Sequence, residues 1–302
     1  MQTITICILC RNRPEYARQA ILSILEQTYK NFELLVSDNS SNDEVQNMMK
    51  REFPEVCYIR RAPPQELWEH INRCIEELRS EYFCLFHDDD VMKPEFVETV
   101  ETYLRAYPAA IAFGCNAEVE TCGKKEARNF FRSFRKQEVL TMPREMAERY
   151  FSRAQSGFPP FPGYVYNRSM IGDQRLPYDG GKYADVTWLL NLIRKGNIVW
   201  ITKPLMIYRY HENNYGKTES VQDRLKFLAY LKSNRAEFGE GILKDYRYSF
   251  VYKKLLKTCE NRSLIRCRTA ASFKNYYRWN RYLRLDYYKA LIVRALVKLV
   301  AE

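Results

Sequence analysis

The chain has 302 residues, enough for one large catalytic domain and a smaller appendage. The excess of basic side chains, a net charge of +11, is confined to the end of the chain: residues 1–215 hold 28 Lys and Arg against 29 Asp and Glu, whereas residues 216–302 hold 20 against 8. Nine cysteines without the layout of a small disulfide-rich domain exclude that class of secreted protein, and we expect reduced thiols and a cytoplasmic location.

The first strand is predicted at residues 3–10, which are apolar apart from two threonines. Residues 1–3 lead directly into it and lack a basic start, so we expect no signal peptide. Cys7 and Cys10 form a C-x-x-C pair, but side chains three positions apart on a strand point to opposite faces. We therefore expect neither a redox pair nor a zinc site there.

The residues after this strand predict a helix. Asn12 is the expected N-cap and Pro14 lies in the first turn, and apolar side chains then recur at helical spacing. Further strands are predicted at residues 32–36, 57–60 and 82–86, with a helix at residues 67–78. This alternation is typical of an α/β fold with a mostly parallel central sheet flanked by helices.

Three consecutive carboxylates, Asp88, Asp89 and Asp90, follow the strand at residues 82–86 almost directly. Like charges this close raise one another's pKa unless a positive group lies among them, so the cluster predicts a bound cation. Oxygen ligands favour Mg²⁺ or Mn²⁺. The alternative is a solvated acidic turn that caps a helix beginning near Pro94.

Polar loops follow three of the predicted strands, at residues 10–13, 38–42 and 87–90. In open α/β sheets, ligands bind beyond the carboxyl ends of the strands, where these loops gather. The three loops are therefore predicted to form one site.

Several segments resemble family 2 glycosyltransferases with the GT-A fold. The donor half of that family is matched by residues 8–16, by residues 23–41, which include the specific Gln-Thr-Tyr-Lys-Asn-Phe-Glu run, and by the aspartate triplet. Residues 177–179, 184–190, 195–196 and 204–214 resemble the part that supplies an acceptor-side carboxylate and a late Arg/His pair. The resemblance covers about residues 3–215.

The resemblance implies a Rossmann-like GT-A catalytic domain over residues 1–215. Its donor-binding half would be residues 1–115 and its acceptor half residues 116–215, followed by a basic helical region at residues 216–302. It further implies an inverting, metal-dependent glycosyltransferase that moves a sugar from a nucleotide-diphospho-sugar, expected to be a UDP-sugar, to a hydroxyl of a glycan or lipid-linked acceptor. The expected setting is cell-surface polysaccharide synthesis, with Mn²⁺ or Mg²⁺ as cofactor bound at a DXD motif.

The resemblance also implies roles for individual positions. Asp38 would accept a hydrogen bond from the base of the nucleotide, and Asp185 would deprotonate the acceptor hydroxyl. The positions implied for donor nucleotide binding are Cys10, Arg11, Asn12, Arg13, Asp38, Asn72, Asp88 and Asp89. The positions implied for the metal are Asp90, Asp89 and His211, and those for the diphosphate are Arg209 and His211. The alternatives are that Asp38 bonds only its own turn and that Asp185 is only an N-cap or a partner of the helix dipole.

Four positions depart from the family's usual pattern. Arg11 stands where an aromatic side chain is common, Ser37 and His87 where Asp is usual, and Ala184 where an acidic residue is frequent. These departures leave the identity of the donor open.

Two other functions are compatible with parts of the sequence. A nucleotidyltransferase would share the sheet and the metal carboxylates, but residues 9–13 lack the glycine-rich phosphate loop that it needs. A non-catalytic membrane- or nucleic-acid-binding module on a GT-A scaffold is the second, and the retained acidic residues argue against it.

The basic region at residues 216–302 mixes aromatic and cationic side chains. This mixture predicts a helical surface that binds anionic lipid, which would make the protein peripheral on the inner face of the cytoplasmic membrane. The alternatives are helices that pack on the catalytic domain and a nucleic-acid patch, the latter not expected as a partner. The apolar runs at residues 288–300 are shorter than the ~20 residues that a membrane span requires.

Overall fold

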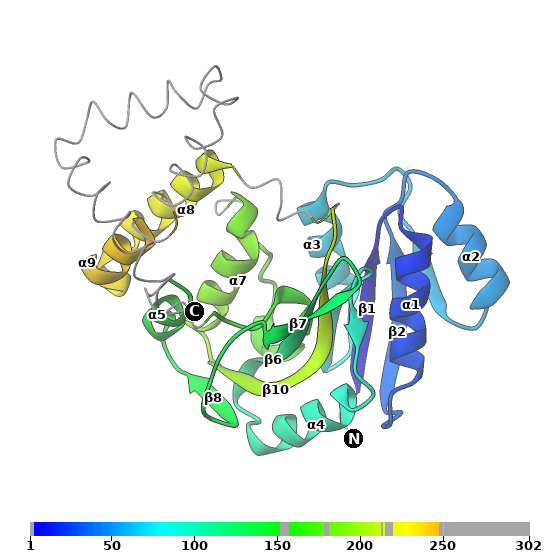
Figure 1. The fold of residues 1–302 in the computed structure, drawn as a ribbon, viewed down its shortest axis with the longest axis horizontal. Coiled ribbons are helices and arrows are strands. Elements are labelled where there is room, and N and C mark those ends of the chain that lie inside the picture. Colours follow the sequence, from blue (N-terminus) through cyan, green and yellow to red (C-terminus); the bar gives the residue numbers. More distant parts are fainter. Residues whose placement is uncertain are drawn as a thin grey trace.

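A computed structural model describes residues 3–151, 157–177, 181–212, 214, 220–247 and 250 (Figure 1). The described strands are β1 (Ile4–Cys10), β2 (Phe32–Asp38), β3 (Cys57–Arg60), β4 (Tyr82–His87), β5 (Val91–Met92), β6 (Ala110–Thr121), β7 (Lys124–Asn129), β8 (Gln137–Leu140), β9 (Tyr164–Asn167) and β10 (Asn197–Tyr210). The described helices are α1 (Pro14–Leu25), α2 (Glu44–Glu52), α3 (Leu67–Glu77), α4 (Phe96–Ala106), α5 (Pro143–Phe151), α6 (Arg168–Ile171), α7 (Ala184–Leu192), α8 (Val221–Ser233) and α9 (Arg235–Tyr246), with short 3₁₀ turns η1 (Phe161–Gly163) and η2 (Gly181–Tyr183).

These strands form one sheet in the order β3-β2-β1-β4-β9-β6-β10-β5, with β7 and β8 attached to β6 and β10. The first four strands of that order are parallel. The antiparallel pairs lie in the second half of the sheet, where β9 joins β4 to β6 and β5 and β8 pair with β10. The predicted α/β class with a parallel core is confirmed, and the antiparallel strands are added to it.

The sheet is buried on both faces by two hydrophobic clusters. Helices α1, α2 and α4 cover one face, and α3, α5, α7, α8 and α9 contribute to the cluster on the other. Figure 1 shows α1 and α2 beside β1 and β2 at one end of the molecule, with α5, α8 and α9 at the opposite end. Cys7 and Cys10 belong to different clusters, which confirms that the two side chains point to opposite faces of β1.

The first part of the basic region continues the folded core. Ser220 and Asp223 form a reciprocal capping box that starts α8. Phe227, Leu231 and Tyr246 from α8 and α9 are fully buried in the same cluster as the side chains of α7. The remainder of this region, residues 251–302, where most of the predicted basic and aromatic surface falls, lies outside the described residues.

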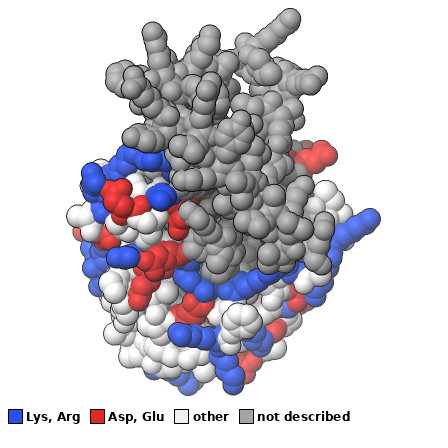
Figure 2. Space-filling view, turned by 60° about the vertical axis from the view of Figure 1, so that its left-hand side comes forward, with Lys and Arg blue, Asp and Glu red and all other residues white. Residues whose placement is uncertain are grey.

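The described residues contain no helix that is both long and apolar enough to span a membrane. On the face seen in Figure 2, their basic and acidic side chains are interspersed rather than separated into patches of one sign.

Candidate active site

The site is built where three parallel strands end. The register of the sheet places Cys10, the last residue of β1, beside Asp38 of β2, and it places Leu9 beside His87, the last residue of β4. The loops that follow therefore meet at one edge, as the sequence predicts. Arg209 and His211 reach the same edge from the end of β10. The Arg209 backbone amide donates to Asp90 Oδ1 at 3.0 Å, and His211 contacts Asp89.

Asp88 is fully buried and both of its carboxylate oxygens are occupied. The Arg11 amide donates to Oδ2 at 2.9 Å, and the guanidinium of Arg13 forms an ion pair with Oδ1. Burial raises the pKa of Asp88 to about 7, although Arg13 acts in the opposite direction. Asp88 is therefore held by the loop after β1, and each of its oxygens already accepts one donor from that loop.

Asp89 is held by two cationic or polar side chains on the same oxygen. Arg13 Nη1 lies 2.5 Å from Oδ2, and His211 Nε2 lies 2.8 Å from it. Burial would raise the pKa of Asp89, but His87, Arg13 and His211 together lower it below its ordinary value. Asp89 is the residue that links the loop after β1 to the end of β10.

Asp90 presents a buried oxygen without a partner. Its Oδ1 accepts the Arg209 amide, whereas its Oδ2 has no hydrogen bond to any residue in the described part of the chain. Burial first, and then the charge of Asp89, raise the pKa of Asp90 well above its ordinary value. A buried, unpartnered carboxylate oxygen is costly unless a ligand occupies the space in front of it.

One ligand atom each from His87, Asp89 and Asp90 lie within 4.8 Å of one another, a separation that suits a single metal ion. Burial lowers the pKa of His87, which favours the neutral imidazole whose lone pair a metal ion needs. The residues present therefore fit a divalent cation. His87 lies in the predicted loop at residues 87–90 and among the departures from the family's pattern, but it was not among the predicted metal ligands. Its position directly before the aspartate triplet was the signal that could have suggested this role.

The late Arg/His pair is supported from α1. Arg209 donates to the Asp89 carbonyl and to the side chain of Gln19, and its guanidinium carbon lies 4.8 Å from the ring centroid of Tyr16. The Tyr16 ring also stacks on His211, with ring centroids 5.0 Å apart. Tyr16 and Gln19 were not among the predicted site residues.

Asp38 is fully buried and its carboxylate accepts from three protein donors. Oδ2 accepts from the Tyr58 hydroxyl and from Arg60 Nη1, each at 2.6 Å, and Oδ1 accepts from the Ser40 amide at 2.9 Å. The last bond is the local turn that was the alternative for this residue. Arg60 and Tyr58 come from β3, so the carboxylate also joins two strand ends.

Asn12 is not the N-cap of α1, which corrects the prediction. Arg13 occupies that position without a side-chain cap bond, and Asn12 has a left-handed backbone with φ of 55°. Its side-chain Oδ1 accepts the backbone amide of Ser41 at 2.8 Å, and its own backbone amide donates to Ser40 Oγ at 2.7 Å. These long-range bonds to the loop after β2 take the place of a local cap.

Three other predicted donor-site positions differ in exposure. The Cys10 side chain is buried, and burial raises the pKa of its thiol, whereas Arg11 is exposed. Asn72 is buried on α3, and its amide bonds the backbone of Leu176 at 2.7 and 3.1 Å. Its side chain therefore ties α3 to the loop after α6, and these bonds do not involve the aspartate triplet.

Ser37, which stands where the family usually has Asp, is also tied into the protein. Its hydroxyl lies 2.8 Å from His70 Nε2 and accepts from Arg61 Nε at 3.0 Å. Arg61 is in turn paired with Glu77 at 2.6 Å. The buried guanidinium of Arg61, next to the end of β2, is thus neutralised by the more exposed Glu77.

Asp185 lies in the first turn of α7, whose side chains Trp188, Leu189 and Leu192 are completely buried. Its Oδ1 accepts the amide of Val186 at 2.9 Å. Tyr183 occupies the N-cap position, so Asp185 is not the N-cap that was its alternative role. Burial raises the pKa of Asp185 to about 6, which is within the range of a general base at neutral pH.

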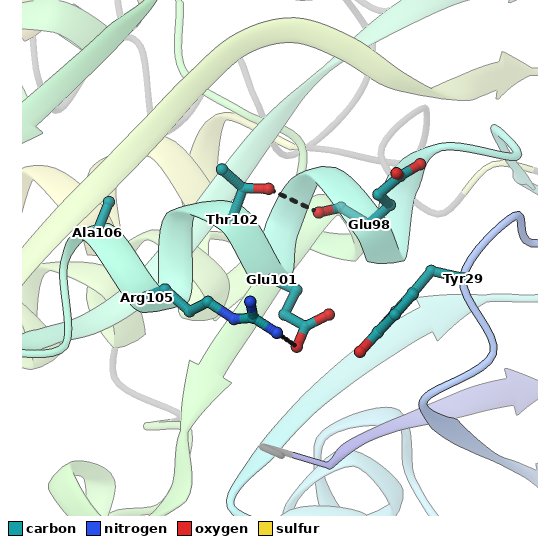
Figure 3. Close-up of a pocket in the computed structure, with 6 residues that line it drawn as sticks. All are labelled: Tyr29, Glu98, Glu101, Thr102, Arg105 and Ala106. Atoms are coloured by element: carbon teal, nitrogen blue, oxygen red, sulfur yellow. Dashed lines mark hydrogen bonds and ion pairs between the residues drawn. The ribbon is translucent and has the colours of Figure 1, made fainter.

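A surface cavity of about 550 Å³ lies apart from these residues, between α4 and Tyr29 (Figure 3). It is lined by Tyr29, Glu98, Glu101, Thr102, Arg105 and Ala106. Arg105 and Glu101 pair with each other at 2.5 Å, and Thr102 bonds the backbone of Glu98. None of the acidic residues at the strand ends lines this cavity, so we do not assign it to the active site.

Residues 5–171 match the family model described as glycosyl transferase family 2. The match spans more than half of the chain. The chain belongs to glycosyl transferase family 2.

Two relatives match part of the chain. A glycosyltransferase of Rickettsia prowazekii is 32% identical over 95 residues, which are 32% of this chain and 30% of that protein. Glycosyltransferase GlyA of Streptococcus pneumoniae is 31% identical over 114 residues, or 37% of this chain and 16% of that protein. The matched segment thus spans less than a third of either relative.

Two solved structures are similar over most of this family 2 chain. Staphylococcus aureus TarS residues 1–349 in complex with UDP-GlcNAc superposes with a TM-score of 0.62 at 12% identity, covering 84% of this chain and 74% of that one. The mannosyltransferase PcManGT from Pyrobaculum calidifontis, in complex with GDP-Man and Mn²⁺, gives 0.53 at 14% identity, covering 98% and 86%. At these identities the likeness shows the fold, and it confirms the GT-A prediction.

Proposed function

We propose that this protein transfers a sugar from a nucleotide-diphospho-sugar to an acceptor hydroxyl, with inversion at the anomeric carbon and with help from a divalent cation. The observation that carries the proposal is the buried oxygen of Asp90 without a partner, beside Asp89 and His87 and next to Arg13 and Arg209. Carboxylates and cations gathered at strand ends suit a metal diphosphate. Family membership and two similar folds with bound nucleotide-sugars support the same activity.

The donor would be held by the loops after β1, β2 and β4. Arg13 lies at the centre of these loops and offers a guanidinium to phosphate oxygens. Arg209 and His211 come from the end of β10, where His211 shares Asp89 Oδ2 with Arg13, and they would contact the diphosphate from there. Asp38, with Tyr58 and Arg60, lies beside Cys10 and would face the base, for which we propose uracil.

Asp89 and Asp90, with His87 or His211, would hold the cation. When bound, it would neutralise the charge that accumulates on the diphosphate as the sugar–phosphate bond breaks. Asp88 would act differently, because its two oxygens position Arg11 and Arg13.

Asp185 would act as the general base. It would accept the proton of the acceptor hydroxyl as the acceptor oxygen bonds to the anomeric carbon, while the electron pair of the broken bond leaves with the nucleoside diphosphate. Attack from the side opposite the diphosphate inverts the anomeric configuration. We propose that the acceptor is a glycan or a lipid-linked glycan of a cell-surface polysaccharide, brought near by a membrane-facing region at residues 216–302.

The first test is a thermal-shift screen of UDP, GDP, CDP and dTDP, each with Mn²⁺, Mg²⁺ or EDTA. We expect UDP with a divalent cation to raise the Tm by about 5 °C at a concentration of ~100 Kd, because a ligand that binds only the folded state stabilises it. EDTA should remove most of this shift. If no nucleotide raises the Tm with any metal, the proposal fails and a non-catalytic role is favoured.

The pH profile of transfer provides a second expectation. Protonated Asp185 has no lone pair for the acceptor proton, so activity should be lost as the pH falls through its pKa of about 6. We expect kcat/KM for the acceptor, at saturating donor and metal, to rise about tenfold per pH unit below this value and to level off above it. Saturating donor and metal keep the aspartate triplet in one state. A profile that is flat across pH 6 would contradict the assignment.

A further inference from the structure

We propose that His87 is a direct ligand of the metal ion, and that its imidazole makes the site select a first-row transition ion such as Mn²⁺ over Mg²⁺. The proposal rests on the metal-dependent transfer proposed above. Position 87 is one where the family usually has Asp, so the proposal concerns a difference between this chain and the usual family pattern.

The backbone brings His87 into the cluster. His87 is the last residue of β4, and the Asp90 amide approaches the His87 carbonyl at 3.4 Å, which turns the chain back on itself. This turn lets one ligand atom from each of His87, Asp89 and Asp90 lie within 4.8 Å of the others. Ligands on opposite sides of a Mn²⁺ or Mg²⁺ ion are about 4.2 Å apart, so only small side-chain adjustments are needed.

Each member of the set has a ligand atom to give. Asp90 Oδ2 is buried without a partner, and the side-chain contacts of Asp89 fall on Oδ2, which leaves Oδ1 for an ion. Within the described ranges, neither ring nitrogen of His87 has a hydrogen-bond partner, and the ring packs on Phe161 with centroids 5.8 Å apart. An apolar neighbour on the ring face fixes the imidazole without competing for its lone pair.

The other candidate ligands are engaged differently. Both oxygens of Asp88 are taken by Arg11 and Arg13, which removes it from the ligand set. His211 bonds Asp89 at 2.8 Å but does not belong to the set of three, so it orients a ligand rather than completing the group. His87 is therefore the imidazole that shares a set of candidate ligands with Asp90.

The replacement of a carboxylate by an imidazole changes the ion that the site prefers. Mg²⁺ is bound almost entirely by oxygen and dehydrates reluctantly, whereas imidazole nitrogen suits first-row transition ions. A neutral ligand also lowers the negative charge of the site by one relative to a carboxylate at the same position. The first effect acts against Mg²⁺ in particular, whereas the second weakens the binding of either divalent ion.

The experiment measures binding of the metal alone to the full chain, without nucleotide. Calorimetric titration with Mn²⁺ and Mg²⁺ is combined with pulsed electron paramagnetic resonance of bound Mn²⁺, in which a directly bound imidazole nitrogen modulates the spin echo. We expect the wild type to bind Mn²⁺ at least about tenfold more tightly than Mg²⁺ and to give the nitrogen modulation. His87→Asp should reduce the preference to about threefold or less and remove the modulation, because it restores an all-oxygen set.

His211→Gln is the matched control, since it removes the other imidazole at the site. Because His211 orients Asp89, this variant should bind both ions more weakly by a similar factor, but the nitrogen modulation from His87 should persist. His87→Asn serves as a second variant if His87→Asp does not fold, as judged by its thermal melt, and it should also lose the modulation.

The inference is overturned if the modulation survives in the His87 variants, if they keep the wild-type metal preference, or if the wild type binds neither ion. Its failure differs from that of the proposed function. Nitrogen-ligated Mn²⁺ without metal-dependent nucleotide binding would reject the function and keep this inference, whereas metal-dependent UDP binding that is indifferent to residue 87 would do the reverse.

Discussion

Replacement of Asp185 by Asn is expected to abolish sugar transfer while leaving donor binding unchanged. The amide has nearly the same shape but cannot accept the acceptor proton, so kcat should fall by about 10²–10⁴-fold, the usual contribution of a general base. Asp185 lies on α7, whereas the predicted donor residues lie on the loops after β1, β2 and β4. The metal-dependent thermal shift with UDP should therefore equal that of the wild type.

The same variant should be more stable than the wild type at pH 8. Burial raises the pKa of Asp185 to about 6 in the folded state, above the unfolded value of about 4. Folding then disfavours the ionised carboxylate, and this cost develops as the pH rises from about 4 through 6. Asn carries no charge and avoids this cost. We therefore expect the free energy of unfolding of the variant to exceed that of the wild type by about 1–2 kcal/mol at pH 8, after allowance for residual exposure, and to equal it near pH 4.

The control for Asp185→Asn is Asp173→Asn, which makes the same change at an exposed position after α6. It should alter neither turnover nor the free energy of unfolding. Wild-type turnover in Asp185→Asn would show that another group accepts the proton.

Replacement of Arg13 by Met is expected to cause the largest loss of stability. It leaves Asp88, which is completely buried, without the guanidinium that neutralises it. Removal of one partner of a buried ion pair costs about 3–5 kcal/mol, and the partial exposure of Arg13 places the expectation near about 3 kcal/mol. Donor affinity should fall as well, because Arg13 is a proposed phosphate contact.

The loss in Arg13→Met should depend on pH. Asp88 titrates with a pKa of about 7 in the wild type, and a protonated carboxyl leaves no unpaired charge. Removal of Arg13 raises that pKa further, so the unfolding free energy of the variant should fall increasingly below that of the wild type as the pH rises through 7. Urea unfolding below pH 6 and above pH 8 measures both limits.

Arg18→Met is the matched control on the same helix. Arg18 pairs with Glu52 at 2.5 Å, but its side chain is 46% exposed, and exposed ion pairs contribute about 0–1 kcal/mol. Equal losses in the two variants would contradict the view that the Arg13–Asp88 pair neutralises a buried charge.

The strand ends could be predicted from the sequence because hydrophobic period and composition are local properties of the chain. Period and composition placed the strands at residues 57–60 and 82–86 within one residue of β3 and β4, and parallel strands end at the same edge. The alternative of Asp185 as an N-cap likewise implied a helix start, and Asp185 lies in the first turn of α7. These features need no knowledge of distant contacts.

The partners of the site residues could not be read in this way. Asn12 has the composition of an N-cap, but Ser40 and Ser41, almost thirty positions away, provide better hydrogen bonds and hold it in a left-handed backbone. Arg60 is one of 48 basic residues, and only the register of β2 against β3 brings it to Asp38. The antiparallel insertion of β9 between β4 and β6 is equally non-local.

By itself, the sequence determined the α/β class through its hydrophobic period and the family through segments that resemble family 2 glycosyltransferases. It also determined the edge of the sheet where the acidic residues gather, because the ends of the parallel strands are marked locally. Only the tertiary structure decided which oxygen of each aspartate is occupied and that His87 lies beside Asp89 and Asp90. The reason is that the donors to these oxygens come from the loop after β1, from β3 and from β10, and the separation of these segments in the chain carries no signal of their distance in space.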